Sequence, residues 1–167
     1  MPVRSTDGNK TPPPLIWTVD SVSDRPLSSL KPYARNNRRH SAMNIARLAN
    51  SIATFGFVVP IVTDGDGVII CGHGRYFAAQ DLGLAMVPTV IADHLTDAQV
   101  RALRIADNKL AELSEWDDDA LRIELGDLAE LDFAGNLDFD LTVTGWDTPQ
   151  LDLIIGEAGG KELSEEK

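Results

Sequence analysis

The sequence predicts an α+β fold, with a small mixed β-sheet and packed helices followed by a helical extension. Three observations support this fold class. Short runs rich in β-branched residues alternate with segments whose apolar residues recur at helical spacing. Clusters of turn residues, such as DGDG at positions 64–67, separate the runs. After residue 95 the apolar residues follow a helical pattern almost throughout.

Short apolar runs predict the strands. The second and third runs are separated by the DGDG turn, so they are expected to form a hairpin. Pro60 in the second run indicates an edge or irregular position, because proline cannot donate to a strand ladder. A later run, LDFDLTV at 137–143, alternates and predicts one further strand. The earlier strands are expected at residues 15–19, 57–63, 68–71 and 87–92.

Helical spacing predicts the remaining elements. The first helix starts at Ser41, and Gly56 can end it in a left-handed conformation. The third opens with Thr96 and Gln99, which have the spacing of a capping box. The last has Thr148 as its N-cap, followed by a proline suited to the first helical position. The helices are expected at residues 41–56, 76–82, 96–110, 117–131 and 149–155.

Length and composition bound the organisation of the chain. Its 167 residues are enough for one domain with a modest extension. The single cysteine, Cys71, excludes an internal disulfide, and no apolar run has the roughly 20 residues needed to span a bilayer. These features favour a cytoplasmic protein without membrane contact. The expected segments are a disordered leader at 1–14, a domain at 15–95, a mainly helical extension at 96–157 and a flexible tail at 158–167.

The charge is strongly acidic but unevenly distributed. A net charge of −11 repels nucleic acid overall and argues against a free-standing DNA-binding protein. Residues 31–47 nevertheless carry lysine and arginine without aspartate or glutamate, whereas residues 112–152 are heavily acidic. The basic cluster is either a solvated loop or a clamp for phosphate. Its candidates for DNA contact are Arg35, Arg38, Arg39 and Arg47.

The stretch CGHGR at 71–75 joins a predicted strand to a predicted helix. Gly72 and Gly74 allow close approach to the backbone, and free N–H groups at a helix start favour an anion. Arg75 can bind phosphate oxygens with its planar fork. The stretch lacks the Lys-Ser/Thr pair of a P-loop and the third glycine of a dinucleotide site. It therefore predicts a phosphate cradle or, alternatively, a glycine turn that packs a helix on a sheet.

Two side chains in this stretch have reactive chemistry. Cys71 ends an apolar strand, where cysteine is usually a small buried hydrophobe, although Arg75 can lower a thiol pKa. His73 can bind phosphate, shuttle protons or simply be exposed, and it is the best catalytic candidate. No metal site is expected, because histidines and cysteines are few and EWDDD at 115–119 is typical of a helix start.

Two features of the extension allow alternatives. Arg101 and Arg104 share a helix face that can touch DNA or, preferably, the acidic segment downstream. Trp116 and Trp146 each lie beside aspartates. They are expected to be core anchors of the extension or part of a dimer contact.

Longer stretches resemble a known superfamily. LKPYARNNRRHS, LANSIATFGFVVPIVTDGDGVI and ICGHGRYFAAQDLGLAMVPTVI are similar to the ParB/sulfiredoxin superfamily over about residues 15–95. They resemble most closely the ParB-like N-terminal domains of phage and bacterial DNA-modification proteins, which often precede a DNA methyltransferase. The continuation LTDAQVRALRIADNKLAELSEWDDDALRIEL, followed by TGWD, resembles the extension of that subgroup.

The resemblance implies a nucleotide site in the ParB/sulfiredoxin type of fold. Sulfiredoxin-like members use ATP and partition proteins use CTP, so ATP or CTP with Mg²⁺ is the implied cofactor. The family's reactive cysteine or glutamate is replaced by His73, and the second arginine of partition proteins by Gly74. These departures argue against sulfinic acid reduction and CTP hydrolysis. The implied phosphate-binding residues are Gly72, His73, Gly74, Arg75, Asn37, Arg38 and His40.

The leading functional hypothesis is a nucleotide-binding ParB-like module that serves DNA modification, partition or transcriptional regulation as a binding or switch domain. One alternative is a small ATP-dependent phosphoryl transferase, kinase-like, or a nuclease-like enzyme using the same pocket. Another is a DNA-contacting accessory domain without nucleotide. The expected partners are a nucleotide, DNA or a DNA-modification domain, and a second copy in a homodimer.

Overall fold

The computed structural model describes residues 21–156 of the chain. The strand predicted at 15–19 and both predicted flexible ends lie outside the described residues. Within them the structure has a four-stranded sheet, five α-helices and two 3-10 helices, so the predicted α+β class is confirmed. No helix in this part of the chain is both long and apolar enough to cross a membrane.

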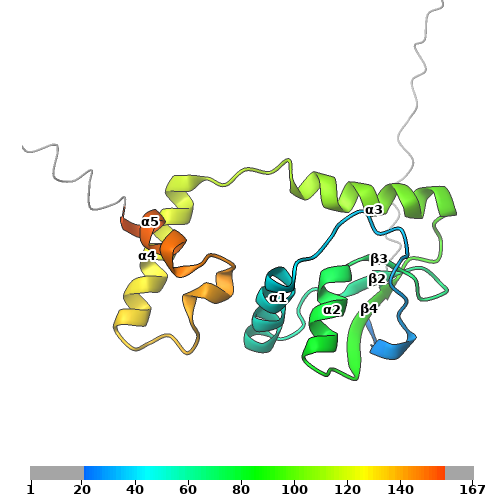
Figure 1. Cartoon of the computed structure of the whole chain (residues 1–167), viewed down its shortest axis with the longest axis horizontal. Helices are drawn as coiled ribbons and strands as arrows, with labels where there is room; N and C mark the ends of the chain where they lie inside the picture. Colours follow the sequence, from blue (N-terminus) through cyan, green and yellow to red (C-terminus); the bar gives the residue numbers. More distant parts are fainter. Residues whose placement is uncertain (1–20, 157–167) are drawn as a thin grey trace, which may run out of the picture.

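The sheet has the strand order β1-β4-β2-β3 (Figure 1). Strands β2 (Ile61–Thr63) and β3 (Ile69–Cys71) pair antiparallel and form the predicted hairpin. Strand β4 (Met86–Ile91) lies parallel to β2 and pairs antiparallel with β1 (Ser23–Pro26) on its other side. The sheet is therefore mixed, as predicted.

Two strand predictions differ from the structure. The strand predicted at 57–63 begins only at Ile61, and the residues before it, including Pro60, belong to no strand. Proline has no N–H to offer a strand ladder, so it favours this late start. Strand β1 was not predicted from the sequence. Its residues, SDRP, are polar and all exposed, so they carry no hydrophobic alternation.

The helices lie close to their predicted positions. Thr96 and Gln99 form the predicted capping box at the start of α3. Helix α2 begins earlier than predicted, at His73, because Gly72 adopts a φ of 99° and turns the chain directly from β3 into the helix. The helices are α1 (Ala42–Phe55), α2 (His73–Asp81), α3 (Asp97–Ala111), α4 (Asp118–Phe133) and α5 (Thr148–Gly156).

The strand predicted at 137–143 is wrong. This stretch leads into a 3-10 helix, η2 (Leu141–Thr144), and the other 3-10 helix is η1 (Leu27–Ser29). The Asp140 side chain accepts a backbone N–H two residues on, and such local bonds compete with strand pairing. Helix α5 is capped by Asp147 instead of the predicted Thr148, since Asp147 accepts a first-turn N–H at 3.0 Å.

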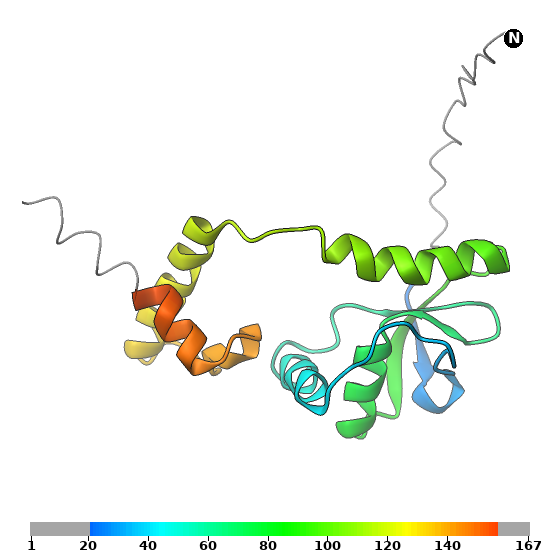
Figure 2. The same cartoon turned by 45° about the horizontal axis from the view of Figure 1, so that its top comes forward.

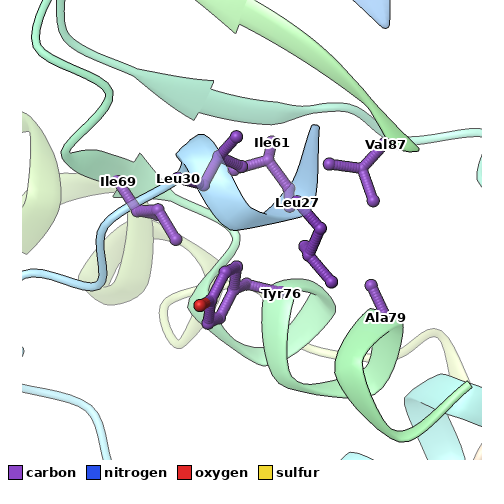
Figure 3. Packing of buried hydrophobic residues seen from close by; sticks show 7 residues of the cluster. All are labelled: Leu27, Leu30, Ile61, Ile69, Tyr76, Ala79 and Val87. Carbon is purple, nitrogen blue, oxygen red and sulfur yellow. The ribbon is translucent and has the colours of Figure 1, made fainter. Parts of the chain in front are cut away.

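Hydrophobic side chains pack on both faces of the sheet. On one face, Ile61 and Ile69 pack with Tyr76 of α2, as Figure 3 shows. On the other face, Ile70 of β3 packs with Val100 of α3. Neighbouring strand residues therefore face opposite helices, as the alternation of side chains along a strand requires. The sheet is sandwiched between α2 and α3, and α1 packs beside α2.

The part of the chain after α3 lies beside α1, away from the sheet (Figures 1 and 2). The ring centroids of Phe55 in α1 and Phe139 are 5.5 Å apart in an edge-to-face contact. Arg47 Nη2 lies 3.7 Å from Asp147 Oδ2. Helix α3, which the sequence assigned to the extension, packs on β3 instead. Within residues 21–156, the part that lies away from the sheet therefore begins after α3.

The two tryptophans contact each other within this extension. The ring centroids of Trp116 and Trp146 lie 6.0 Å apart. Trp116 is 68% exposed, so it is not the core anchor that was one of the two expectations, and a role in a dimer contact stays a prediction. The buried residues of α4 and α5 are Leu125 and Leu151.

Candidate functional site

An open cavity of about 280 Å³ lies where the chain before α1, the start of α2 and the second half of α3 meet. Its wall includes the whole glycine turn between β3 and α2. The lining residues are Asn36, Arg38, His40, Leu48, Val59, Cys71, Gly72, His73, Gly74, Arg75, Asp107 and Asn108. The structure thus brings six of the seven predicted phosphate-binding residues to one cavity.

The two glycines of the turn have different roles. Gly72 is the N-cap of α2 and adopts the left-handed conformation, which costs most residues energy but is open to glycine. A Cβ on Gly74 would lie 2.7 Å from Leu48 Cδ1 and 3.1 Å from the His40 ring. Gly74 therefore allows α1 and α2 to approach closely. Gly74 also lines the cavity, so its predicted part in binding phosphate stays a prediction beside this packing role.

Arg75 folds back over the turn. Its Nη2 donates to the Pro60 carbonyl at 3.2 Å, while its buried Nε has no hydrogen-bond partner. Burial lowers the pKa of Arg75, and the nearby Asp107 carboxylate opposes that shift. A buried donor without a partner is costly, so the arginine retains capacity for an anionic ligand.

His73 is buried, so of the three roles left open by the sequence, the simply exposed side chain does not apply. Its Nε2 accepts the Tyr33 backbone N–H at 3.2 Å. Burial lowers the pKa of His73 to about 4, and the charges of Arg104 and His40 act in the same direction. The imidazole is therefore neutral at physiological pH, and its accepting nitrogen is already occupied. Its low pKa makes the ring a weak base, and the bond from Tyr33 engages its accepting nitrogen, so His73 is poorly suited to act as a general base.

Cys71 closes a buried strand, as the sequence indicated. Its side chain is buried, and burial raises the pKa of the thiol to about 12, with a further contribution from Asp107. Thiolate is the reactive form of cysteine, so a thiol in this environment is a poor nucleophile.

Residues 35–40 alternate between two sides of the chain. Arg38 and His40 line the cavity, together with Asn36 in place of the predicted Asn37. Asn37 faces a second, smaller pocket on the other side. The sequence did not distinguish the two asparagines, because their order along the chain does not say which side each one faces.

Polar contacts hold this segment beside the cavity. Asn36 Nδ2 donates to the Arg38 carbonyl at 2.9 Å, and His40 Nδ1 lies 3.2 Å from Asn44 Oδ1 of α1. Arg38 Nη1 is 3.5 Å from Glu112 Oε1 at the end of α3. Both partners of this ion pair are about half exposed, so an anion in the cavity can compete with Glu112 for Arg38.

Helix α3 supplies cavity residues that sequence reasoning missed. Asp107 and Asn108 follow Arg104 at the i+3 and i+4 positions, which places all three near one face of the helix. Arg104 is buried, and its Nε donates to the Ile69 carbonyl at 3.0 Å. This contact corrects the expectation that Arg104 touches the acidic segment downstream. The helical spacing could have shown that these three residues share a face. It could not show that this face packs on the sheet.

The four predicted DNA-contact residues are in two situations. Arg38 and Arg47 pair with Glu112 and Asp147, and these ion pairs connect the basic segment to the acidic chain that follows. Arg35 and Arg39 are exposed. Within residues 21–156, no three side chains of His, Cys, Asp or Glu cluster in a way that could hold a metal ion.

The mixed sheet between α2 and α3, with the glycine turn at its edge, defines a domain of the ParB/sulfiredoxin superfamily. More specifically, the chain belongs to the ParB N-terminal domain family, whose model matches residues 17–109, more than half of the sequence. The resemblance seen in the sequence is thereby confirmed at the level of the superfamily and the family.

Two curated relatives illustrate the similarity. The ParB-like nuclease domain-containing protein YnaK of Escherichia coli is 47% identical over 75 residues, which cover 45% of this chain and 86% of the relative. The chromosome-partitioning protein Spo0J of Thermus thermophilus is 37% identical over 87 residues, or 50% of this chain. That match spans only 32% of Spo0J, so the chain corresponds to about a third of this relative.

A solved structure shares the fold over most of the chain. It is the C-terminally truncated chromosome-partitioning protein ParB of Caulobacter crescentus complexed with CTP-γ-S. The TM-score is 0.66 with 20% sequence identity, and the alignment covers 87% of this chain and 88% of that one. At this identity the likeness establishes the fold alone.

Proposed function

We propose that this chain is a nucleotide-binding ParB-like module that acts as a binding or switch domain in DNA partition, DNA modification or transcriptional regulation in the cytoplasm. One observation carries the proposal: the glycine turn, Arg75 and Arg38 converge on one cavity of about 280 Å³. This volume is close to the lower end, about 300 Å³, of small-molecule sites in proteins.

The residues of the cavity suit the phosphates of a nucleotide. Free N–H groups at the start of α2 and the dipole of that helix favour negative charge at the glycine turn. Arg75 lines the cavity, and a guanidinium can bind phosphate oxygens through its planar fork. Arg38 also lines the cavity and adds a second guanidinium. These groups would bind and orient the triphosphate.

CTP is the first nucleotide to test, and ATP is the comparison. The Caulobacter crescentus ParB structure of the same fold holds CTP-γ-S. A Mg²⁺ ion bound with the nucleotide would neutralise part of the phosphate charge. Asp107 is the one carboxylate among the cavity residues, so it is the candidate to face that ion.

Calorimetric titration of CTP and ATP, with Mg²⁺, tests the proposal. The Arg75→Ala variant is compared with wild type and with Arg25→Ala, which removes an exposed arginine of β1 outside the cavity. We expect Arg75→Ala to weaken nucleotide binding by about tenfold or more, since hydrogen bonds to charged groups contribute about 1.5–3 kcal/mol. Arg25→Ala should bind as wild type does. Equal affinity of all three proteins, or no binding by any of them, contradicts the proposal.

A catalytic role is a second candidate, favoured by one observation. The Asp107 carboxylate lines the same cavity as the glycine turn and Arg75, which is the minimum for a phosphoryl-transfer or nuclease-like site. The test measures release of phosphate from CTP and ATP, phosphate transfer to small hydroxyl compounds, and cleavage of DNA. Turnover by wild type that is lost in Asp107→Asn supports an enzyme. Nucleotide binding without turnover supports the switch module.

The partners follow from the same proposal. DNA, a DNA-modification domain such as a methyltransferase, and a second copy of the chain remain the proposed partners. Light scattering with and without CTP would detect a homodimer, and an unchanged monomer mass at saturating CTP would contradict it.

A further inference from the structure

A second pocket of about 110 Å³ lies on the other side of the segment formed by residues 35–40. Its floor is the first half of α3, whereas the larger cavity is lined by the second half of that helix. The two pockets have no lining residue in common. The second pocket is lined by Tyr33, Arg35, Asn37, Arg101, Arg104 and Ile105.

The charge of this pocket is uniformly positive. Three of its six lining residues are arginines, and none is acidic. In the described part of the chain, the ion pairs involve neither Arg35, Arg101 nor Arg104. Three guanidinium groups around a small space repel one another, and an anion bound between them relieves that repulsion. The concentration of positive charge is notable in a chain whose net charge is −11.

The pocket is held in place by contacts that leave donors free. The Arg104 guanidinium carbon lies 3.8 Å from the centroid of the Tyr33 ring, and its Nε is bound to the Ile69 carbonyl. Tyr33 is fixed in turn by its N–H bond to His73. Arg104 is buried, whereas Arg35 and Arg101 are exposed at the mouth. A buried, hydrogen-bonded arginine and two exposed ones around a small space suit a compact oxyanion.

We propose that this pocket is a phosphate-group site, separate from the nucleotide cavity. Its volume is that of about three to four water molecules, which suits one phosphate group and is too small to enclose a whole nucleotide. Arginine forks match the oxygens of phosphate in pairs, and Asn37 adds an amide donor. The phosphate belongs either to a free phosphorylated compound or to the backbone of a nucleic acid strand.

The test follows backbone amide signals of the full chain by NMR. The probes are inorganic phosphate and, separately, a short single-stranded DNA oligonucleotide. We expect shifts at residues 33–37 and 101–105, with affinity about tenfold weaker in Arg101→Ala and Arg35→Ala. Arg25→Ala, an exposed arginine outside both pockets, and Arg75→Ala, in the nucleotide cavity, should retain these shifts. The spectra themselves report whether each variant is folded.

The two probes distinguish the source of the phosphate. Saturable binding of inorganic phosphate without oligonucleotide binding assigns the pocket to a free phosphorylated compound. If the oligonucleotide binds, the slope of log affinity against log salt concentration is compared between wild type and Arg101→Ala. A slope smaller by about one unit in Arg101→Ala assigns the pocket to a nucleic acid backbone. The inference is overturned if neither probe shifts these residues, if Arg101→Ala binds as Arg25→Ala does, or if Arg75→Ala abolishes the shifts.

Discussion

Replacing Gly72 by alanine separates backbone strain from ligand binding at the turn. Gly72 has a φ of 99°, and its added Cβ would lie 3.0 Å from Arg75 Nη2 and 3.3 Å from Arg75 Nε. Gly83, at the end of α2, provides the matched control. Its φ is 67°, and nothing lies within 4 Å of an added Cβ. Both substitutions force alanine into a left-handed conformation, but only the first also displaces the guanidinium.

The expected magnitudes follow from these two differences. Left-handed backbone costs an L-residue about 1–2 kcal/mol, so both Gly72→Ala and Gly83→Ala should lower the free energy of unfolding by about that amount. The Arg75 side chain can yield by rotating, so the close contact adds little to the stability loss of Gly72→Ala. That rotation removes the guanidinium from its present position in the cavity. We therefore expect a loss of nucleotide affinity of about tenfold in Gly72→Ala alone.

Two measurements check this prediction. Urea denaturation gives the free energy of unfolding of each variant, and calorimetry with CTP gives the affinity. Both are compared at a temperature at which each variant is fully folded. If Gly72→Ala binds CTP as tightly as wild type does, the role assigned to Arg75 is refuted. If Gly83→Ala loses as much CTP affinity as Gly72→Ala does, backbone strain is the cause of the loss.

Three further predictions concern His73, Cys71 and Glu112. The pKa of His73 is lowered from 6.5 to about 4, so the unfolded chain binds a proton at this histidine more tightly than the folded chain does. The contribution of His73 to the free energy of unfolding is therefore complete above pH 6.5. It falls by up to about 3 kcal/mol as the pH decreases toward 4. Urea denaturation at several pH values should show this slope in wild type but a smaller one in His73→Gln. Cys71, with a pKa of about 12, should react with a disulfide reagent at pH 8 only as fast as the protein unfolds, and rapid labelling of the folded protein would contradict its burial. Glu112→Gln frees Arg38 and should tighten CTP binding up to about fivefold, whereas Glu115→Gln, an acid outside the ion pairs of the described chain, should not.

Local patterns predicted most of the elements and the centre of the candidate site. Gly72 and Arg75 were found because the glycines, the preceding apolar strand and the following helix are contiguous in sequence. The same reasoning placed α1 and α3, whose caps are local features. Strand β1 escaped prediction because its residues are exposed and polar, so its identity depends on pairing with β4.

The rest of the site depends on tertiary packing. Asp107 and Asn108 reach the cavity only because α3 packs on the sheet. The sequence of α3 alone does not show which surface the helix packs against. The sequence left the role of His73 open, because its hydrogen-bond partner, the Tyr33 backbone N–H, comes from a distant part of the chain. Arg104 looked like a surface arginine, but it is buried against β3.

The alternation of residues 35–40 places a limit on the length of that segment. Arg35 and Asn37 face one pocket, whereas Asn36 and Arg38 face the other. Inserting or deleting one residue ahead of Arg35 would change which side chains face each pocket. Most surface loops tolerate insertions and deletions. This segment is fixed at both ends, because Tyr33 is hydrogen-bonded to His73 and Ser41 caps α1. The number of residues between these two points therefore matters as much as their composition.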